Sequence, residues 1–299
     1  MRVGAAVLRP YTLTLMFFLL HLMSVIAIAL PAQLGYTFVF GRGKILHFGP
    51  IGVSVVAAYG TFLTLNATGS FILGLCIGVL MAILFSLLFA WLSFRLDPDG
   101  LGVMSIAVYL TLFTIVLNWS ELTRGALGLP RIPRLPFAES ALSFTIVTST
   151  ICIAWVLFFL WLDRTKLARQ VSALAEGEWY AKAMGISRVR AHLIAFLILG
   201  LTLASDNFFY AQYYHLLHPS DYYFPAFVSL LMITVAGKPG STAGAIVATI
   251  LLTVLKEGVR FLPFPTEVLG PLRLMLFGII LLAAVWIQRD TLFPKKRTI

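Results

Sequence analysis

Asp206 and Asn207 lie inside an apolar run, residues 192–217, whose composition otherwise suits a lipid environment. A carboxylate at the centre of such a helix costs about 2.5–3.5 kcal/mol on insertion scales, so it usually faces a bundle interior or water. Asp206 is therefore a candidate for lining a solute pathway or for forming an ion pair. The alternative is a position near the outer membrane interface, because Gln212 and Tyr213 follow in the same run.

No combination of residues predicts a catalytic, nucleotide-binding or metal site. The segments GRGKI (41–45) and AGKPGST (236–242) both fail the G-x-x-x-x-G-K-[ST] spacing that lets backbone N–H groups cradle phosphates. H-E-x-x-H and G-x-S-x-G motifs do not occur, and the five histidines show no ligand spacing. Cys76 and Cys152 lie within apolar runs and imply no disulfide framework. We therefore expect no cofactor in this chain and no ATP hydrolysis by it.

Long apolar runs dominate the chain, which is 60% hydrophobic and 11% charged. A helix needs about 20 apolar residues to span a bilayer core, and only helices and closed barrels satisfy the backbone in lipid. These runs do not alternate as barrel strands do. They predict an all-α polytopic bundle of transmembrane helices, and the first run is too long for a signal-peptide core. The runs are 11–31, 71–94, 101–119, 141–162, 192–217, 243–254 and 271–288.

One polar segment, residues 163–190, interrupts this pattern with six Lys/Arg and three Asp/Glu. As a single helix over 167–184 it places Val171, Leu174 and Ala181 on one side, and Gly185 is a suitable C-terminal stop. One interpretation is an ordinary interfacial helix that stabilises a loop. The other is a short docking helix that sits in a groove of a cytoplasmic partner and transmits force.

Charge predicts the orientation of the helices. The Arg/Lys content of 163–190 and the PKKRTI tail with Arg289 place both segments in the cytoplasm. Four helices, 191–217, 222–236, 241–260 and 267–288, separate them, and the loop 120–140 is then external. The net charge of +10 reports this orientation, so we expect no nucleic-acid partner.

The N-terminal third leaves the helix count open at eight to ten. Arg2 and Arg9 favour an internal start, whereas counting single helices at 11–31, 45–65, 70–93 and 100–119 requires an external one. A short or broken segment in the glycine-rich stretch 32–60 reconciles the two, and half-helices of this kind mark substrate pathways in transporters. We expect one membrane domain, 1–299.

The motif E-x-x-A-x-x-x-G-I, read as Glu178, Ala181, Gly185 and Ile186, resembles the coupling loop of ABC importer permeases. The stretch ALAEGEWYAKAMGISRVRAHLIAF resembles the branched-chain amino acid permease family in particular. Three further stretches resemble that family in its order. They are LGYTFVFGRGKILHFGPIGVSVVAAYG (34–60), LNWSELTRGALGLPRIPRLPF (117–137) and HPSDYYFPAFVSLLMITVAGKPGSTAGAIVATILL (218–252), so the likeness spans about 30–285.

The resemblance implies a permease subunit in the bacterial inner membrane. Its implied partners are two cytoplasmic ATPase subunits that bind ATP and Mg, a second related permease chain and an extracytoplasmic solute-binding protein. The implied ATPase-coupling residues are Ala173, Leu174, Glu176, Glu178, Ala181, Gly185 and Ile186. The pathway and gating candidates are Gly49, Gly52, Tyr59, Thr123, Gly125, Gly128, Asp206, Asn207, Ser229, Gly237 and Gly240.

The chain departs from the family pattern at several positions, which leaves the cargo open. Ala175 stands where the family often has arginine, Lys238 where a second glycine is usual, and Asp206–Asn207 where small residues are usual. Branched-chain or related amino acids are the implied cargo, and urea, amides, sugars or nucleosides are the alternatives. A stand-alone secondary carrier or channel is the rival interpretation, but it gives residues 163–190 no role.

Overall fold

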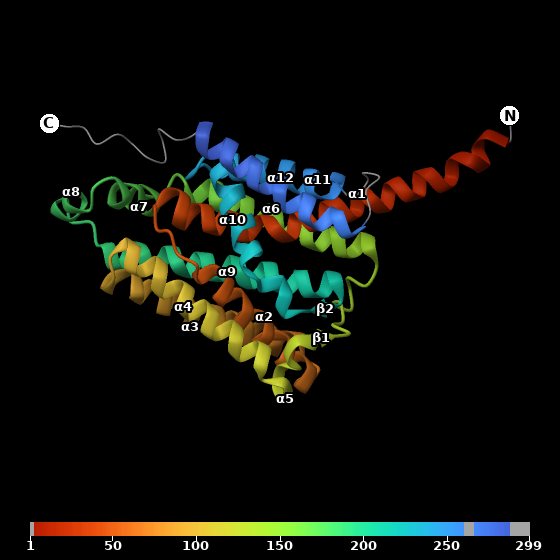
Figure 1. Ribbon diagram of the computed structural model, residues 1–299, viewed down its shortest axis with the longest axis horizontal. Coiled ribbons are helices and arrows are strands. Elements are labelled where there is room, and N and C mark those ends of the chain that lie inside the picture. The colour runs from red at the N-terminus through yellow and green to blue at the C-terminus, as the bar shows by residue number, and fades with distance from the viewer. Residues whose placement is uncertain (1–2, 260–265, 288–299) are drawn as a thin grey trace.

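A computed structural model describes residues 3–259 and 266–287 of the chain, and helices account for most of them (Figure 1). This confirms the predicted all-α bundle. Residues 1–2 and 288–299, which include Arg2, Arg289 and the PKKRTI tail, lie outside the described residues. The α-helices are α1 Val3–Tyr36, α2 Gly49–Thr68, α3 Phe71–Arg95, α4 Pro98–Asn118, α5 Ser120–Thr123, α6 Ala141–Leu162, α7 Lys166–Glu176, α8 Glu178–Ala183, α9 Arg188–Tyr214, α10 Phe224–Ala236, α11 Thr242–Gly258 and α12 Thr266–Ile287.

Among the described residues, six helical segments are long and apolar enough to cross a membrane. Their outer faces carry large exposed side chains such as Ile72, Val103 and Leu157, which are 76%, 72% and 61% exposed. Lipid tails accept such side chains, whereas water does not. The chain is therefore a multi-pass membrane protein. The segments are Leu15–Arg42, Gly49–Thr68, Phe71–Arg95, Pro98–Asn118, Ala141–Leu162 and Arg188–Tyr214.

Short polar side chains start the helices. The side chains of Ser70, Asp97, Ser140, Ser187 and Ser241 each accept a hydrogen bond from a backbone N–H in the first turn that follows. Such a cap satisfies one of the donors that a helix start leaves open, a group that is costly to leave unsatisfied near lipid. These caps set the helix boundaries close to those that the apolar runs predicted.

The glycine-rich stretch after α1 is irregular, as expected, but adds no separate helix. A π-helical turn, η1 (Thr37–Arg42), continues α1, and residues 43–48 are non-helical before α2 begins at Gly49. Because the chain reverses only once here, α1 begins at the end of the bundle that carries the 119–140 loop (Figure 1). This agrees with the count that requires an external start.

Helix packing places α1 and α9 at the centre of the bundle. α1 packs on α6, α9 and α11, and α2 packs on α3, α4 and α9. Close approaches occur at glycines: a Cβ at Gly78 would overlap the Thr61 side chain, and one at Gly200 would overlap Ser86. Small residues allow the close backbone contact that drives helix association in lipid, where the hydrophobic effect does not act between helices.

Two small strands join the loops at the end opposite α7 and α8. β1 (Leu129–Pro130) pairs antiparallel with β2 (Leu216–Leu217), and the Ile132 N–H donates to the His215 carbonyl at 3.2 Å. The loop 119–140 is therefore fixed to the loop that follows α9. The apolar runs gave no sign of this pairing.

The polar segment is not the single helix that the pattern predicted over 167–184. It divides into α7 and α8 at Gly177, whose backbone is extended at φ −172° and ψ 93°. The burial prediction is confirmed, because Val171, Leu174 and Ala181 are all buried against the bundle. Gly185 is left-handed at φ +78°, as a glycine stop requires.

Gly244 offers a test of the close helix approaches. A Cβ there would overlap the carbonyl oxygen of Gly237 in the turn between α10 and α11, whereas nothing lies within 4 Å of a Cβ at Gly258 in the same helix. We expect Gly244→Ala to lower the free energy of unfolding by about 1–3 kcal/mol. The control Gly258→Ala should be neutral or stabilise by at most about 1 kcal/mol. Unfolding temperatures in detergent measure both, and equal effects would refute this packing.

Candidate functional site

The α7–α8 end of the bundle carries an amphipathic segment. The Thr165 side chain caps α7 through the Ala168 N–H, and the buried Ala168, Val171 and Leu174 repeat every three residues along one face. An apolar stripe at that spacing holds a helix against a core. α7 is therefore fixed to the bundle, while Gly177 separates it from α8.

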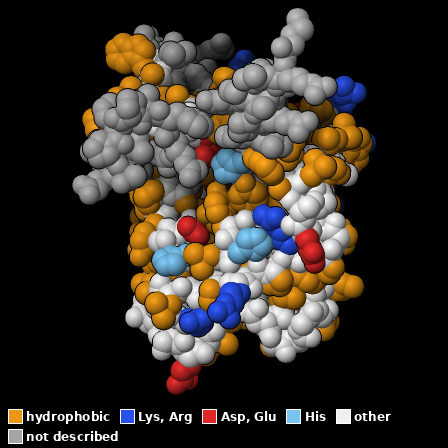
Figure 2. Space-filling model, turned by 90° about the vertical axis from the view of Figure 1, so that its right-hand side faces the viewer, with side chains coloured by type: hydrophobic (Ala, Val, Ile, Leu, Met, Phe, Trp, Pro, Cys, Tyr) orange, Lys and Arg blue, Asp and Glu red, His pale blue; other side chains and the backbone are white. Residues whose placement is uncertain are grey.

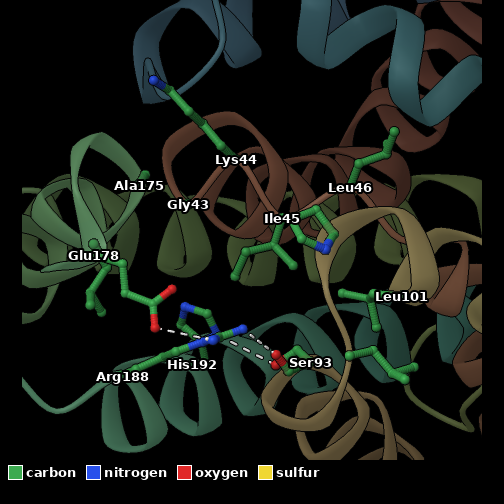
Figure 3. A pocket seen from close by; sticks show the side chains of 13 residues that line it. Gly43, Lys44, Ile45, Leu46, Ser93, Leu101, Ala175, Glu178, Arg188 and His192 are labelled. Carbon is green, nitrogen blue, oxygen red and sulfur yellow. Dashed lines mark hydrogen bonds and ion pairs between the residues drawn. The ribbon is translucent and has the colours of Figure 1, made fainter.

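An ion-pair cluster fixes the start of α8 to two membrane helices. Glu178 pairs with Lys182 at 2.6 Å and with Arg188 at 3.1 Å, and Arg188 also donates to the Ser93 carbonyl at the end of α3 (Figure 3). The hydrogen bond from Lys182, together with the charge of Arg188, lowers the pKa of Glu178. His192, one turn further along α9, contacts the Ser93 hydroxyl at 3.4 Å. The cluster lines a cavity of about 180 Å³.

The predicted coupling residues differ in how far they are exposed. Leu174 and Ala181 are buried, so they hold the segment in place and face away from any partner. Glu176 and Gly185 are exposed, and Ala173, Glu178 and Ile186 are half-buried.

Sequence reasoning missed three large apolar side chains of this segment that are exposed. Trp179, Tyr180 and Met184 are 88%, 80% and 69% exposed. The signal was present in the sequence, since two adjacent aromatic residues occur inside the most polar stretch of the chain. Trp179 and Tyr180 lie on α8 and Met184 follows it directly, and we call these three residues the α8 aromatic patch.

Arg42 links three elements beneath α7. Its guanidinium donates to Asp163 after α6 at 2.5 Å and to the Gly240 carbonyl in the α10–α11 turn at 3.1 Å. Gly240 is left-handed at φ +83°, and a Cβ at Gly41 would meet the Gly240 nitrogen at 2.5 Å. Gly240, which the sequence gave as a gating candidate, therefore lies at a close backbone contact with Gly41, and the candidate Gly237 lies at another, with Gly244.

Most of the other pathway candidates lie apart from one another. Gly49 and Gly52 are in the first turn of α2, where Gly52 packs on α4, and Tyr59 is buried further along α2. A second set belongs to the loop before and around β1. In that loop the Thr123 hydroxyl donates to the Val116 carbonyl in α4 and to the Trp119 carbonyl after it. Gly125 and Gly128 have positive φ, and Gly128 packs on β2.

Three pathway candidates do come together. Asp206, Asn207 and Ser229 line one cavity of about 270 Å³ between α1, α2, α9 and α10. A second hollow of about 520 Å³ shares Tyr210, Tyr214, Asp221 and Lys256 with it and continues towards the β1–β2 end. Figure 2 shows basic, acidic and histidine side chains gathered on that end of the molecule. Burial raises the pKa of Asp221, in the 3-10 turn η3 (Pro219–Tyr222) after β2.

The fold and the site define a class of protein. A bundle of membrane-length helices holds a partly polar cavity towards one end and an exposed amphipathic segment at the other, an arrangement typical of the membrane subunit of a transporter. The chain belongs to the family described as the branched-chain amino acid transport system permease component, whose family model matches residues 15–285.

Two curated relatives extend this assignment. The chain is 26% identical over 294 residues to the high-affinity branched-chain amino acid transport system permease protein LivM of Escherichia coli (strain K12). It is 25% identical over the same length to LivM of Salmonella typhimurium (strain LT2). Each alignment covers 88% of this chain and 67% of the relative. No solved structure was found to match the chain. The family and the helix pattern place the protein in the bacterial inner membrane as a multi-pass subunit.

The Arg42 contacts generate a stability prediction. Arg42 and Asp163 have side chains only 17% and 25% exposed. The free-energy cost of removing one partner therefore lies between the cost for an exposed pair and that for a buried pair. We expect Arg42→Gln to cost about 1–3 kcal/mol of unfolding free energy. Arg164→Gln, at an exposed neighbouring position, should cost much less. The unfolding temperatures of Arg42→Gln, of Asp163→Asn and of the double variant give the coupling energy, and that of Arg164→Gln gives the control. Additive effects of the two single substitutions at Arg42 and Asp163 would contradict the pair.

Proposed function

We propose that the chain is the permease subunit of an ATP-binding cassette importer for branched-chain or related amino acids. The family assignment and the names of the two relatives support the transport role and the class of cargo. The chain supplies the translocation path and no catalytic residue. ATP and Mg are bound and ATP is hydrolysed by separate subunits.

The α8 aromatic patch is the observation that carries the ATPase partnership. Trp179, Tyr180 and Met184 are exposed at the end of the bundle, on and directly after a short helix in a basic segment. Aromatic residues and methionine are enriched where proteins associate, and a rigid aromatic side chain in a partner's pocket dominates such interfaces. A cytoplasmic ATPase with an apolar groove fits this patch.

The ion-pair cluster gives the docked helix a mechanical path into the membrane. Glu178 opens α8, and its partner Arg188 opens α9 and also binds the end of α3. A displacement of α8 by an ATPase therefore acts on two transmembrane helices at once. Residues 163–190 are cytoplasmic in this proposal, because they carry six Lys/Arg whereas the loop 120–140 at the opposite end carries three.

The remaining partners follow from the same proposal. Two ATPase subunits require two docking segments, so a second, related permease chain completes the pore. A solute-binding protein delivers cargo at the β1–β2 end, where the cavity and its neighbouring hollow are found. The binding protein supplies the affinity for cargo, so the permease itself needs no tight site.

The experiment that tests this function is reconstitution in liposomes. The permease pair, the ATPase subunits and the solute-binding protein from the same genomic neighbourhood should take up leucine only with ATP, and should continue when the proton gradient is collapsed. A secondary carrier, the rival interpretation, would instead move cargo with this chain alone and stop without the gradient. Competition by urea, amides, sugars and nucleosides distinguishes the alternative cargoes.

The α8 aromatic patch makes a separate prediction. Trp179→Ala should reduce ATPase binding by about 2 kcal/mol or more, roughly thirtyfold, as truncation of an interface anchor does. The unfolding temperature should change little, because Trp179 is 88% exposed. Trp119→Ala, at a 52% exposed tryptophan beside the 119–140 loop, is the matched control. Affinity is measured by titrating labelled ATPase onto the permease in nanodiscs, and equal losses for both variants would exclude docking through α8.

A further inference from the structure

The 270 Å³ cavity has one apolar side. α1 contributes Val25, Ile28, Ala29 and Ala32, which repeat along one face of that helix, and α10 contributes Ala226 and Leu230. The two alanines on α1 leave room where larger side chains would fill the space. Pockets for drug-sized ligands begin at about 300 Å³, so this cavity suits a smaller solute with a short aliphatic part.

The opposite side is polar, and most of its groups are satisfied within the protein. The Tyr222 hydroxyl donates to the Asn207 side-chain oxygen at 2.7 Å, and the Asn207 amide donates to the Leu203 carbonyl at 2.7 Å. Tyr109 donates to the Tyr222 carbonyl at 2.8 Å. These contacts fix the wall of the cavity and leave Asn207 and Tyr222 little capacity for a ligand.

Asp206 is the exception on that wall. It lines the cavity from α9, and no hydrogen bond or ion pair from the described residues reaches its carboxylate. It lies eight residues before the end of α9 at Tyr214, about 12 Å along the helix axis. A carboxylate held inside a membrane segment is costly, about 2.5–3.5 kcal/mol, unless water or a cationic group meets it.

Among the described residues that line the cavity, Lys256 alone carries a positive charge, and it also lines the outer hollow together with Asp221. No ion pair joins Lys256 to Asp206 in the part of the chain that the structure describes, so the Asp206 carboxylate is open to a cationic group of a ligand.

We propose that Asp206 is a specificity-determining residue, which receives the primary ammonium group of the cargo while the α1–α10 wall accepts its aliphatic side chain. This deepens the proposed function, on which it rests, by naming the group on the cargo that the permease itself recognises. An ammonium donates three hydrogen bonds, and charge-assisted bonds to a carboxylate are about twice as strong as neutral ones. A metal cation fits less well, because no three His, Cys, Asp or Glu side chains gather in the described part of the chain.

Three probes of one shape test the site directly. 3-Methylbutylamine carries the ammonium, 4-methylpentanoate carries a carboxylate instead, and 3-methylbutanol carries no charge. Each is titrated onto the permease–ATPase complex in nanodiscs without the solute-binding protein, and the alcohol corrects for partition into lipid. We expect saturable binding of the amine alone, weakened at least tenfold by Asp206→Asn and weakened less by Asp206→Glu. Glu121→Gln, which removes an exposed carboxylate at the β1–β2 end, should have no effect.

A second variant covers the case in which Asp206→Asn fails to assemble. Ala29→Phe fills the apolar side of the cavity and keeps the carboxylate, so it should also abolish saturable binding of the amine. Equal binding of the three probes, or amine binding that neither variant changes, would overturn the proposal.

Leucine uptake by the reconstituted importer separates this inference from the proposed function. If Asp206→Asn leaves ATP-driven uptake unchanged, the role of Asp206 is refuted and the importer function stands. If the unaltered complex shows no ATP-driven uptake but amine binding still depends on Asp206, the importer function is refuted and the ammonium site stands.

Discussion

The constraint on which the structure depends is that a polar group inside a bilayer must find its partner within the protein. The backbone groups meet this constraint by forming helices, and many polar side chains meet it by hydrogen bonding within their own helix. Asn207 and Gln212 donate to the carbonyls four residues before them, at 2.7 and 3.0 Å, and Thr61 and Thr249 do the same at 2.8 and 2.7 Å. Because so many polar groups are satisfied within their own helix, a carboxylate that is not, at Asp206, marks a place where something else is expected to enter.

Helix α9 connects the two ends of the molecule. Arg188 in its first turn belongs to the ion-pair cluster with Glu178 and Ser93, and Asp206, eighteen residues later, belongs to the cavity. Gly200 lies between them and packs so closely on α3 that a Cβ would overlap Ser86. A helix that is rigid along its axis and in contact with α3 at both Ser86 and Ser93 moves together with α3. The cavity and the α8 end are thus parts of one mechanical unit.

Much of the fold could be predicted because apolar length and short polar caps are local signals. The predicted helices 222–236, 241–260 and 267–288 differ from α10, α11 and α12 by at most two residues at each boundary. The break at Gly177 was missed because the apolar positions Val171, Leu174 and Ala181 keep helical spacing across it, and spacing does not record a backbone that becomes extended. The β1–β2 pairing and the residues that surround Asp206 could not be predicted for another reason, since both bring together residues that are far apart in the sequence.

The contacts that hold α7 and α8 differ in kind, and this difference matters for coupling. α7 is held by burial: Val171 is 1% exposed and Leu174 is 8% exposed. In α8 the buried side chain is the small Ala181, and the start of the helix is held by Glu178, whose side chain is 36% exposed and pairs with Lys182 within α8 and with Arg188 of α9. An ion pair at that exposure contributes about 0–1 kcal/mol because water screens it, whereas a fully buried leucine contributes about 1.5–3 kcal/mol. Force applied to the α8 aromatic patch therefore meets the weaker attachment first, and Gly177 lies at the boundary between the two.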